Sequence, residues 1–400
     1  MKLLLQAPPG RHASLGLTKA LIRLGVNVDV LSRDTRLILE LLEERTWRPS
    51  LIRLLMGPLG LRSSKMKGLR MLYMPILPGK RTSRLGFKLW LDVYVKRMLC
   101  KYDVIHTNSA GDDLPIRIIN SNVNMVHTVR GSAFLLYNFI YGLEKAPPLY
   151  RKYYEDDLRC VEMLVEIGVP ITTLSAFMRD LLRRYIGVDA EVIYNGCDLK
   201  RFNINVSGKA MRKRWKIPED KKVVIWVGRT TSHKDPLTFL KAIPLVMKEH
   251  GDAIFILEGC GPLDITIRRE INRLKLHKYV IFKNTWLPET IMPYLYAMSD
   301  VFVATYLYEA FGMTVVEAMA CGKPVVATAF GALPELVGDC GLLFEPRNPA
   351  DLAEKISALL DDDELRMKLG RKAFLRVKER FTWDKIAKDY LRVYRRAMRS

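Results

Sequence analysis

Residues 300–328 read DVFVATYLYEAFGMTVVEAMACGKPVVAT, and this stretch decides the fold. Its apolar, β-branched beginning, Asp300–Thr305, predicts a strand, and Pro324–Thr328 predicts another. Between them, a helix is expected to begin near Gly312 and to stop at Gly322. The order strand, helix, strand is the repeating unit of a parallel sheet covered by helices.

Short apolar runs and helix-period segments alternate in the same way over most of the chain. Besides the two strands above, nine further runs are predicted strands: Lys2–Gln6, Val26–Leu31, Asp103–Thr107, Asn124–Val129, Ile171–Leu174, Glu191–Tyr194, Lys222–Val227, Ala253–Glu258 and Tyr279–Lys283. Nearly continuous apolar strands are typical of parallel sheets with both faces covered. The two series therefore predict an α/β protein of two Rossmann-like, doubly wound domains facing a central cleft.

The domain border is expected near the turn signal Asn195-Gly196, because a polar stretch follows it and a new strand comes after. We place an N-terminal domain at 1–200 and a C-terminal domain at 201–380. Residues 381–400 are predicted to form a terminal helix. Its apolar face must pack against a partner, for which we consider the N-terminal domain.

Composition narrows the class of partner and the compartment. Lys and Arg number 64 against 43 acids, a net charge of +21, which favours anionic partners. The six cysteines form no C-x-x-C pair, so we expect no metal. The chain shows neither a signal-peptide core nor an apolar run long enough to span a bilayer. We therefore expect a cytoplasmic protein, soluble or held peripherally on the inner face of a membrane.

The segment 45–101 is strongly basic, and Leu and Ile residues are interleaved with its first cations. Such a stretch can lie on an anionic membrane surface. A pair of core-packed helices with a solvated basic face would give the same pattern. Both interpretations remain open at this point.

The expected turns after strands carry the candidate chemistry of the C-terminal half. The helix start at Gly312 would offer unpaired N–H groups to an anion. Glu309 and Glu317 lie on either side, eight residues apart, which is up to about 12 Å along a helix. Arg229 and Lys234 follow another strand and could neutralise a diphosphate without a metal. A hexose, a diphosphate and a ribose in a row would match this layout.

A third turn holds Gly259 and Gly261, a G-x-G that is weak evidence alone. In the N-terminal half, a loop with Gly10 and Arg11 follows the first strand. Candidate acceptor-side residues there also stand at strand ends: His106, Arg130 and Gly131.

These residues carry a resemblance. EAFGMTVVEAMACGKP (309–324) resembles the signature of the retaining family-4 glycosyltransferases, which have the GT-B fold. The likeness extends to GRTTSHK (228–234), GCGP (259–262), FGALPELVGDCGLLFEP (330–346), YNGCD (194–198) and FTWDKIAKDYLRVY (381–394). The resemblance implies a retaining, metal-independent hexosyltransferase that takes its sugar from a nucleoside diphosphate sugar, by default a UDP-sugar, with no further cofactor. An acceptor glycan or glycolipid would be the second substrate.

The resemblance also implies residue roles. Arg229 and Lys234 would bind the donor diphosphate and stabilise the leaving group, Glu309 would contact the transferred sugar, and Glu317 would hold the ribose hydroxyls. Backbone lining the sugar and phosphates would come from Phe311, Gly312, Met313 and Thr314. The base would sit at the strand end formed by Asn284, Thr285 and Trp286.

Three positions depart from the family pattern. Gly10 is followed by Arg11 rather than by a second glycine, and Asn284 replaces a common glycine. Arg130 stands where many members carry a histidine that contacts the donor sugar, so we expect it to bind an anionic group instead.

Two other functions fit parts of the pattern. A sugar-phosphate epimerase or phosphorylase could share the fold, but the pairing of two acids with two cations disfavours it. A basic nucleic-acid-binding protein would fit the charge. However, the sequence contains no recognition-helix, zinc-finger or RNP-type motif, so no nucleic-acid partner is expected.

Overall fold

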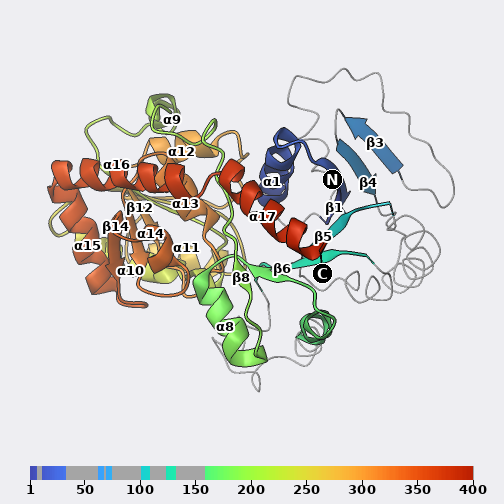
Figure 1. The fold of residues 1–400 in the computed structure, drawn as a ribbon. Coiled ribbons are helices and arrows are strands. Elements are labelled where there is room, and N and C mark those ends of the chain that lie inside the picture. Colours follow the sequence, from blue (N-terminus) through green and yellow to red (C-terminus); the bar gives the residue numbers. More distant parts are fainter. Residues whose placement is uncertain are drawn as a thin grey trace. The chain divides into compact units, whose positions relative to one another are not determined.

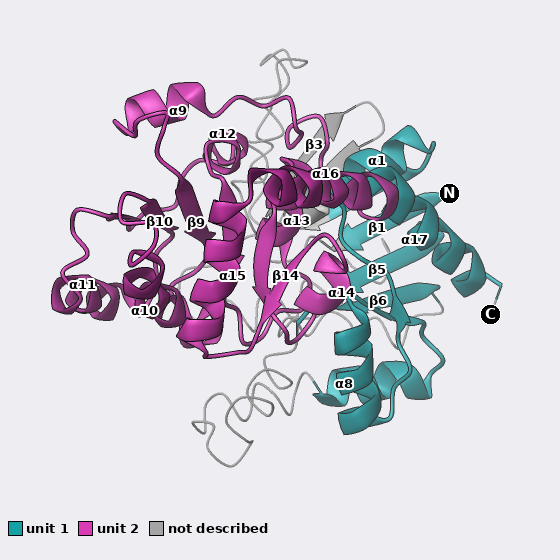
Figure 2. Ribbon diagram, turned by 90° about the vertical axis from the view of Figure 1, so that its left-hand side faces the viewer, with its two compact units in different colours: residues 1–196, 383–400 teal, residues 197–382 magenta. Residues whose placement is uncertain are grey.

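The computed structural model describes residues 1–6, 11–32, 62–66, 69–73, 101–108, 123–131 and 158–399. The chain divides into two compact units (Figure 2). Unit 1 consists of Met1–Gly196 with Trp383–Ser400, and unit 2 of Cys197–Thr382. These borders lie a few residues from the 200/201 and 380/381 borders that the sequence suggests.

Unit 1 is built on a sheet with the strand order β3-β4-β2-β1-β5-β6-β7-β8 (Figure 1). Its strands are β1 (Lys2–Gln6), β2 (Asn27–Ser32), β3 (Arg62–Met66), β4 (Leu69–Tyr73), β5 (Val104–Asn108), β6 (Met125–Val129), β7 (Ile171–Thr173) and β8 (Glu191–Val192). All pairings are parallel except that of β3 with β4. The order reverses between β1 and β5, which marks the switch point of this sheet.

The C-terminal helix belongs to the core of unit 1. The named helices of this unit are α1 (Arg11–Arg23), α8 (Ala176–Ile186) and α17 (Trp383–Ala397). α17 packs beside α1 and against β6 (Figure 1). Its residues Ile386, Tyr390 and Tyr394 are buried among strand residues such as Leu3 and Val126. Their spacing places them on one helical face, which the sheet covers.

Unit 2 holds a six-stranded parallel sheet with the order β11-β10-β9-β12-β13-β14. The strands are β9 (Val223–Val227), β10 (Ile254–Glu258), β11 (Val280–Lys283), β12 (Val301–Ala304), β13 (Val325–Thr328) and β14 (Gly341–Phe344). β9, β12 and β13 are buried throughout, as expected for central strands with both faces covered. The order reverses between β9 and β12, so the carboxyl ends of these two strands form the switch point.

Helices cover both faces of this sheet. They are α9 (Lys209–Arg214), η4 (Ser232–Lys234), α10 (Pro236–Val246), α11 (Asp264–Arg273), α12 (Met292–Ala297), α13 (Met313–Ala320), α14 (Leu333–Val337), α15 (Pro349–Asp361) and α16 (Asp363–Arg380). Phe255 of β10 packs on Phe239 of α10. Phe302 of β12 and Ile256, the residue after Phe255, both pair with Ile225 of β9, so Phe302 and Phe255 lie on opposite faces of the sheet. Phe302 packs on Tyr296 of α12. α10 and α12 therefore lie on opposite faces.

All eleven predicted strands are present, with ends shifted by at most two residues. Three strands were not predicted: β3, β4 and β14. β3 reads RSSKM, which has no apolar alternation, and β14 is a four-residue strand that is only partly buried.

Part of the basic segment 45–101 is described, and it is extended. Its residues 62–66 and 69–73 form the antiparallel pair β3–β4, so neither a membrane-lying helix nor a helix pair describes these ten positions. The rest of the segment, except residue 101, lies outside the described residues. Within the described ranges, no helix has the length and apolar character needed to cross a bilayer.

Candidate active site

The switch point of unit 2 brings the cation and acid candidates together. Arg229 follows β9, while Glu309 and Gly312 follow β12, and these two strands are neighbours. Because the strands are parallel, the loops at their carboxyl ends share one edge of the sheet. The arrangement lies entirely within unit 2.

Lys234 and Glu309 are in direct contact. The Lys234 ammonium donates to Glu309 Oε2, and both side chains are mostly buried. The ammonium also lies over the ring of Tyr306, 3.9 Å from its centroid, which is a cation–π contact. Burial, and then the charge of Arg229, lower the pKa of Lys234 to about 7. Lys234 is therefore only partly charged at neutral pH, and a neighbouring anion favours its charged form.

Arg229 is exposed at the same edge of the sheet. Its charge lowers the pKa of both Lys234 and His233, so its guanidinium lies close to these side chains. Within unit 2 no carboxylate forms an ion pair with it. Arg229 and Lys234 thus form a pair of cations, one open to solvent and one held by an acid.

The start of α13 depends on a glycine. Gly312 is the N-cap, with φ 102° and ψ 61°, a left-handed conformation that strains any other residue. A Cβ atom there would lie 3.2 Å from Leu336 and 3.3 Å from Leu333. The following amides of Met313 and Thr314 come too early to bond within the helix. They form the positive end of the helix dipole next to Glu309.

Glu317 lies inside α13 and is buried. Its Oε2 accepts a hydrogen bond of 2.8 Å from the hydroxyl of Tyr296. Burial raises the pKa of Glu317 to about 7, although Tyr296 and Arg201 oppose the shift. Glu317 is therefore only partly ionised at neutral pH.

The remaining candidates of unit 2 separate into backbone and side-chain positions. Phe311 is buried and its ring packs on Phe381, so only its backbone could line a ligand. A Cβ at Gly259 would lie 1.9 Å from the carbonyl oxygen of Gly228, and one at Gly261 would lie 2.9 Å from that of Thr230. The close packing of the two turns therefore requires both glycines, independently of any ligand.

Asn284, Thr285 and Trp286 form the loop after β11. Asn284 is half-buried and Thr285 is exposed, while Trp286 leaves 58% of its surface open. Glu258 was not predicted to be a site residue. Its Oε1 accepts a hydrogen bond of 3.1 Å from the backbone amide of Leu287 in this loop. The signal was present, because a single charge ends the otherwise apolar strand IFILE.

Tyr296 and Tyr306 were missed as well. Tyr306 donates to the carbonyl of Val227 at 2.6 Å and lies 2.8 Å from the hydroxyl of Thr314, so it links β9 to the start of α13. Buried tyrosines are common in cores, and nothing in the sequence distinguishes these two.

The prediction for His106 is wrong. His106 was predicted to be an acceptor-side residue, whereas the structure buries it completely. Its Nδ1 lies 2.7 Å from the Tyr394 hydroxyl and its Nε2 lies 2.7 Å from the Thr128 hydroxyl. Because both ring nitrogens are used, His106 connects the sheet of unit 1 to α17 instead of reaching an acceptor.

Arg130 is half-buried directly after β6. It donates from Nε to Asn108 at 2.5 Å and from Nη1 to Asn195 at 2.9 Å. Two amide oxygens thus orient the guanidinium at the carboxyl edge of the sheet, where Gly131 follows. Gly10 lies outside the described residues. Arg11 opens α1, and its side chain is likewise not described.

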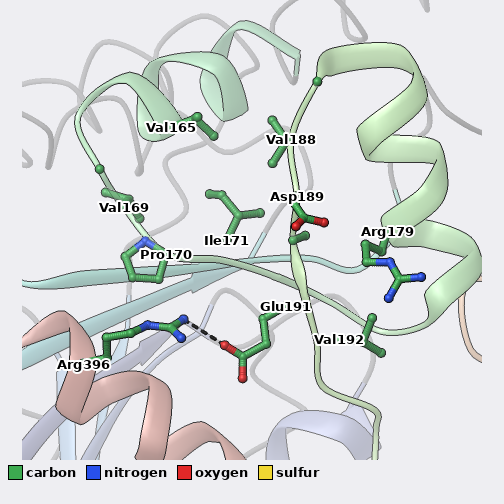
Figure 3. A pocket seen from close by; sticks show the side chains of 13 residues that line it. Val165, Val169, Pro170, Ile171, Arg179, Val188, Asp189, Glu191, Val192 and Arg396 are labelled. Carbon is green, nitrogen blue, oxygen red and sulfur yellow. Dashed lines mark hydrogen bonds and ion pairs between the residues drawn. The ribbon is translucent and has the colours of Figure 1, made fainter.

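Unit 1 also contains a cavity of about 610 Å³ (Figure 3). It lies at the amino ends of β7 and β8, the edge of the sheet opposite to the carboxyl ends. Its walls combine apolar residues such as Ile171 and Val188 with the charged residues Arg179, Asp189, Glu191 and Arg396. Glu191 forms ion pairs with Arg392 and Arg396, at 2.7 and 2.8 Å. The cavity therefore lies at the edge of this sheet away from the carboxyl strand ends, and its acid Glu191 is already paired.

One group of the described residues could hold a metal ion, namely Glu249, His250 and Asp361, with ligand atoms within 4.8 Å of one another. Glu249 and His250 follow α10, and Asp361 ends α15. Both places are at the amino edge of the sheet in unit 2, so this group lies away from Glu309 and Lys234.

The fold and this site define a two-unit α/β protein with a ligand site at a strand switch point. Residues 208–376 match the family profile described as glycosyl transferases group 1, and residues 14–201 match glycosyltransferase family 4. The chain therefore belongs to the group 1, family-4 glycosyltransferases. An uncharacterised glycosyltransferase of Methanocaldococcus jannaschii is 32% identical over 213 residues, which is 52% of this chain. The match spans about half of that relative's length, 54%.

Solved structures share the fold over the whole chain. A sucrose-phosphate synthase from Thermosynechococcus elongatus superimposes with a TM-score of 0.75 at 22% identity, covering 99% of this chain and 98% of its own. Anabaena HepE, solved with UDP and glucose, gives 0.71 at 21% identity, with 98% of each chain covered. The architecture is that of the GT-B glycosyltransferases.

Proposed function

We propose that this protein transfers a hexose from a nucleoside diphosphate sugar to an acceptor hydroxyl, with retention of the anomeric configuration. The observation that carries the proposal is the contact of Lys234 with Glu309 beside the Gly312 start of α13, with Glu317 deeper in the same helix. Glu309, then the two cations with the helix amides, and then Glu317 would follow the order hexose, diphosphate and ribose in the donor.

Each residue has a role that follows from its chemistry. Arg229 and Lys234 bind the diphosphate and stabilise the charge that develops as the bond from the sugar C1 to the phosphate oxygen breaks. The acceptor oxygen bonds to C1, and its proton passes to the departing phosphate oxygen. Glu309 accepts hydroxyl hydrogen bonds from the sugar, and Glu317 accepts them from the ribose. Two cations and a helix start do this without a metal ion.

The donor base is proposed from chemistry and likeness together. The HepE structure contains UDP, which supports a UDP-sugar as the default donor. The sugar is proposed to be a hexose, and the acceptor a lipid-linked or polysaccharide-linked hydroxyl.

Product analysis tests the proposal. The purified chain is incubated with UDP-, GDP-, ADP- and CDP-hexoses and an acceptor mixture of glycans and glycolipids, with and without EDTA. We expect nucleoside diphosphate in amounts equal to a new glycoside, an unchanged anomeric configuration by proton NMR, and no loss with EDTA. Sugar-phosphate interconversion without a new glycoside would instead favour an epimerase or phosphorylase, and abolition by EDTA would refute metal independence.

We also propose that the basic segment 45–101 brings the protein to an anionic membrane that carries the acceptor. Its excess of Lys and Arg supports this, because each cation near an acidic leaflet adds about 1 kcal/mol of attraction. Flotation with phosphatidylglycerol vesicles at low salt should recover the protein with the lipid. Recovery equal to that with neutral vesicles would contradict membrane docking.

A further inference from the structure

Glu258 is a buried acid at the carboxyl edge of unit 2 that the proposed transfer does not use. It ends β10, and only 1% of its surface is exposed. Its neighbours in the strand, IFIL, are all apolar. Burying a charged side chain costs free energy unless hydrogen bonds or ion pairs compensate for it. A buried acid with a shifted pKa at a strand end is therefore a candidate functional group.

Glu258 accepts one hydrogen bond, and Lys283, its register partner on β11, forms no ion pair with it. Its Oε1 accepts the backbone amide of Leu287 at 3.1 Å, which fixes the loop after β11. Among the described residues it forms no ion pair, and burial raises its pKa to about 7. A loop amide needs only one acceptor, which a neutral amide side chain would supply as well. The second carboxylate oxygen is therefore surplus to the structural role.

Glu258 ends β10 at the carboxyl edge of the sheet, two strands from β12, after which the chain enters the helix that holds Glu317. Burial first, then Glu317 and Glu258 among other groups, raise the pKa of Tyr296. Glu317 and Glu258 also raise the pKa of Tyr306. Both carboxylates are thus within electrostatic reach of the same two phenols. A nucleoside with its ribose at Glu317 would direct its base toward the ends of β10 and β11, where Glu258 and the 284–287 loop lie.

We propose that Glu258 recognises the base of the donor by accepting a hydrogen bond from a ring N–H. This inference rests on the proposed function. Uracil N3–H and guanine N1–H are such donors. The corresponding ring nitrogens of cytosine and adenine carry a lone pair, which a carboxylate repels. The donor is therefore a UDP- or GDP-sugar, and CDP- and ADP-sugars are rejected.

The first test is the base preference of the wild-type full chain, measured by calorimetric titration with UDP, GDP, CDP and ADP. The titration is run at pH 8, where Glu258 is mostly ionised. We expect UDP or GDP to bind at least about tenfold more tightly than CDP and ADP, the worth of one well-placed hydrogen bond. Equal binding of all four would overturn the role of Glu258 while leaving the proposed function intact. Absence of binding by all four would refute the proposed function itself.

The variant Glu258→Gln separates base recognition from loop support. Its amide oxygen can still accept the Leu287 N–H, and its NH₂ group then faces the base as a donor. We expect the UDP-to-CDP affinity ratio to fall about tenfold or more, with no loss of melting temperature. The control Glu219→Gln removes an exposed acid from the same unit and should leave the ratio unchanged. A ratio unaltered by Glu258→Gln would overturn the proposal, and the wild-type titration decides if this variant does not fold.

Discussion

Lys234 and Glu309 form an ion pair that is mostly buried. Lys234 is mostly buried and close to Arg229, and both circumstances disfavour its charged form. Contact with the Glu309 carboxylate offsets this. In the proposed reaction, the donor diphosphate takes over the role of that carboxylate, because it brings negative charge to an ammonium that is already desolvated. We propose that Glu309 then turns to the hydroxyl groups of the sugar.

Glu317 gives a prediction at the scale of a single residue. Its pKa rises from the usual 4.5 to about 7 on burial. Between these values the folded state binds more protons than the unfolded state, so this residue's contribution to stability falls as the pH rises. Glu317→Gln cannot ionise and escapes this loss. The difference in unfolding free energy, variant minus wild type, should therefore increase from pH 5 to pH 8 by about 1–3 kcal/mol.

Urea denaturation at several pH values measures this difference directly. The variant Glu249→Gln, which alters an exposed acid, is the control and should follow the wild type. A constant difference between Glu317→Gln and wild type across this range would mean that Glu317 has an ordinary pKa in the folded protein.

At the scale of elements, α13 depends on its first turn. Gly312→Ala forces a Cβ into a left-handed conformation at φ 102° and against two leucines. We expect a loss of about 1–2 kcal/mol in stability and weaker nucleotide binding, since the helix amides would shift. Gly251→Ala is the matched control, because a Cβ there meets only a carbonyl oxygen at 3.5 Å. Thermal melts with and without UDP measure both effects. Equal melting temperatures of the two variants, with equal stabilisation by UDP, would contradict the role of Gly312 at the helix start.

α17 is held to the sheet of unit 1 by a buried polar network. Tyr394→Phe removes the partner of His106 Nδ1 and leaves that nitrogen buried without a hydrogen bond. We expect a loss of about 1–3 kcal/mol in unfolding free energy. Tyr294→Phe, in exposed surroundings, should cost little. Chemical denaturation of both variants compares them, and similar midpoints would refute a structural role for the His106–Tyr394 contact.

The sequence was informative where periodicity and turn chemistry agree. Strand β9 and the Gly312 helix start were both predictable, because an apolar run followed by a glycine turn has few other solutions. β3 was not predictable, since its RSSKM pattern is polar and its pairing with β4 is a tertiary contact. His106 was misplaced for a related reason. A histidine at a strand end can face solvent or a helix, and the residues that surround it are distant in sequence.

The residues of the candidate site could be predicted from the sequence, but their contacts could not. Arg229, Lys234 and the acids could be named from spacing and resemblance. The Lys234–Glu309 contact and the Tyr306 ring beneath it depend on how β9 and β12 pair, which local sequence does not encode.

At the scale of the whole molecule, the sequence of unit 2 lies between the two segments that form unit 1. The chain enters and leaves unit 2 side by side, with the amide of Cys197 bonded to the carbonyl of Phe381 at 2.7 Å. A fragment 197–382 should therefore fold alone with a cooperative thermal transition. A fragment 1–196 should not, because it lacks the α17 residues of its core. Circular dichroism melts of both fragments test this, and cooperative folding of 1–196 would contradict the account.

The central claim is that the switch point of unit 2 binds a nucleoside diphosphate through its paired cations. Calorimetric titration of the full chain with UDP and GDP measures this directly, comparing wild type, Lys234→Met and the exposed control Lys248→Met. We expect one nucleotide per chain for wild type and Lys248→Met, and affinity at least about tenfold weaker for Lys234→Met, because a desolvated ion pair to phosphate is lost. Binding that is equally tight in all three proteins, or absent from the wild type, would contradict it.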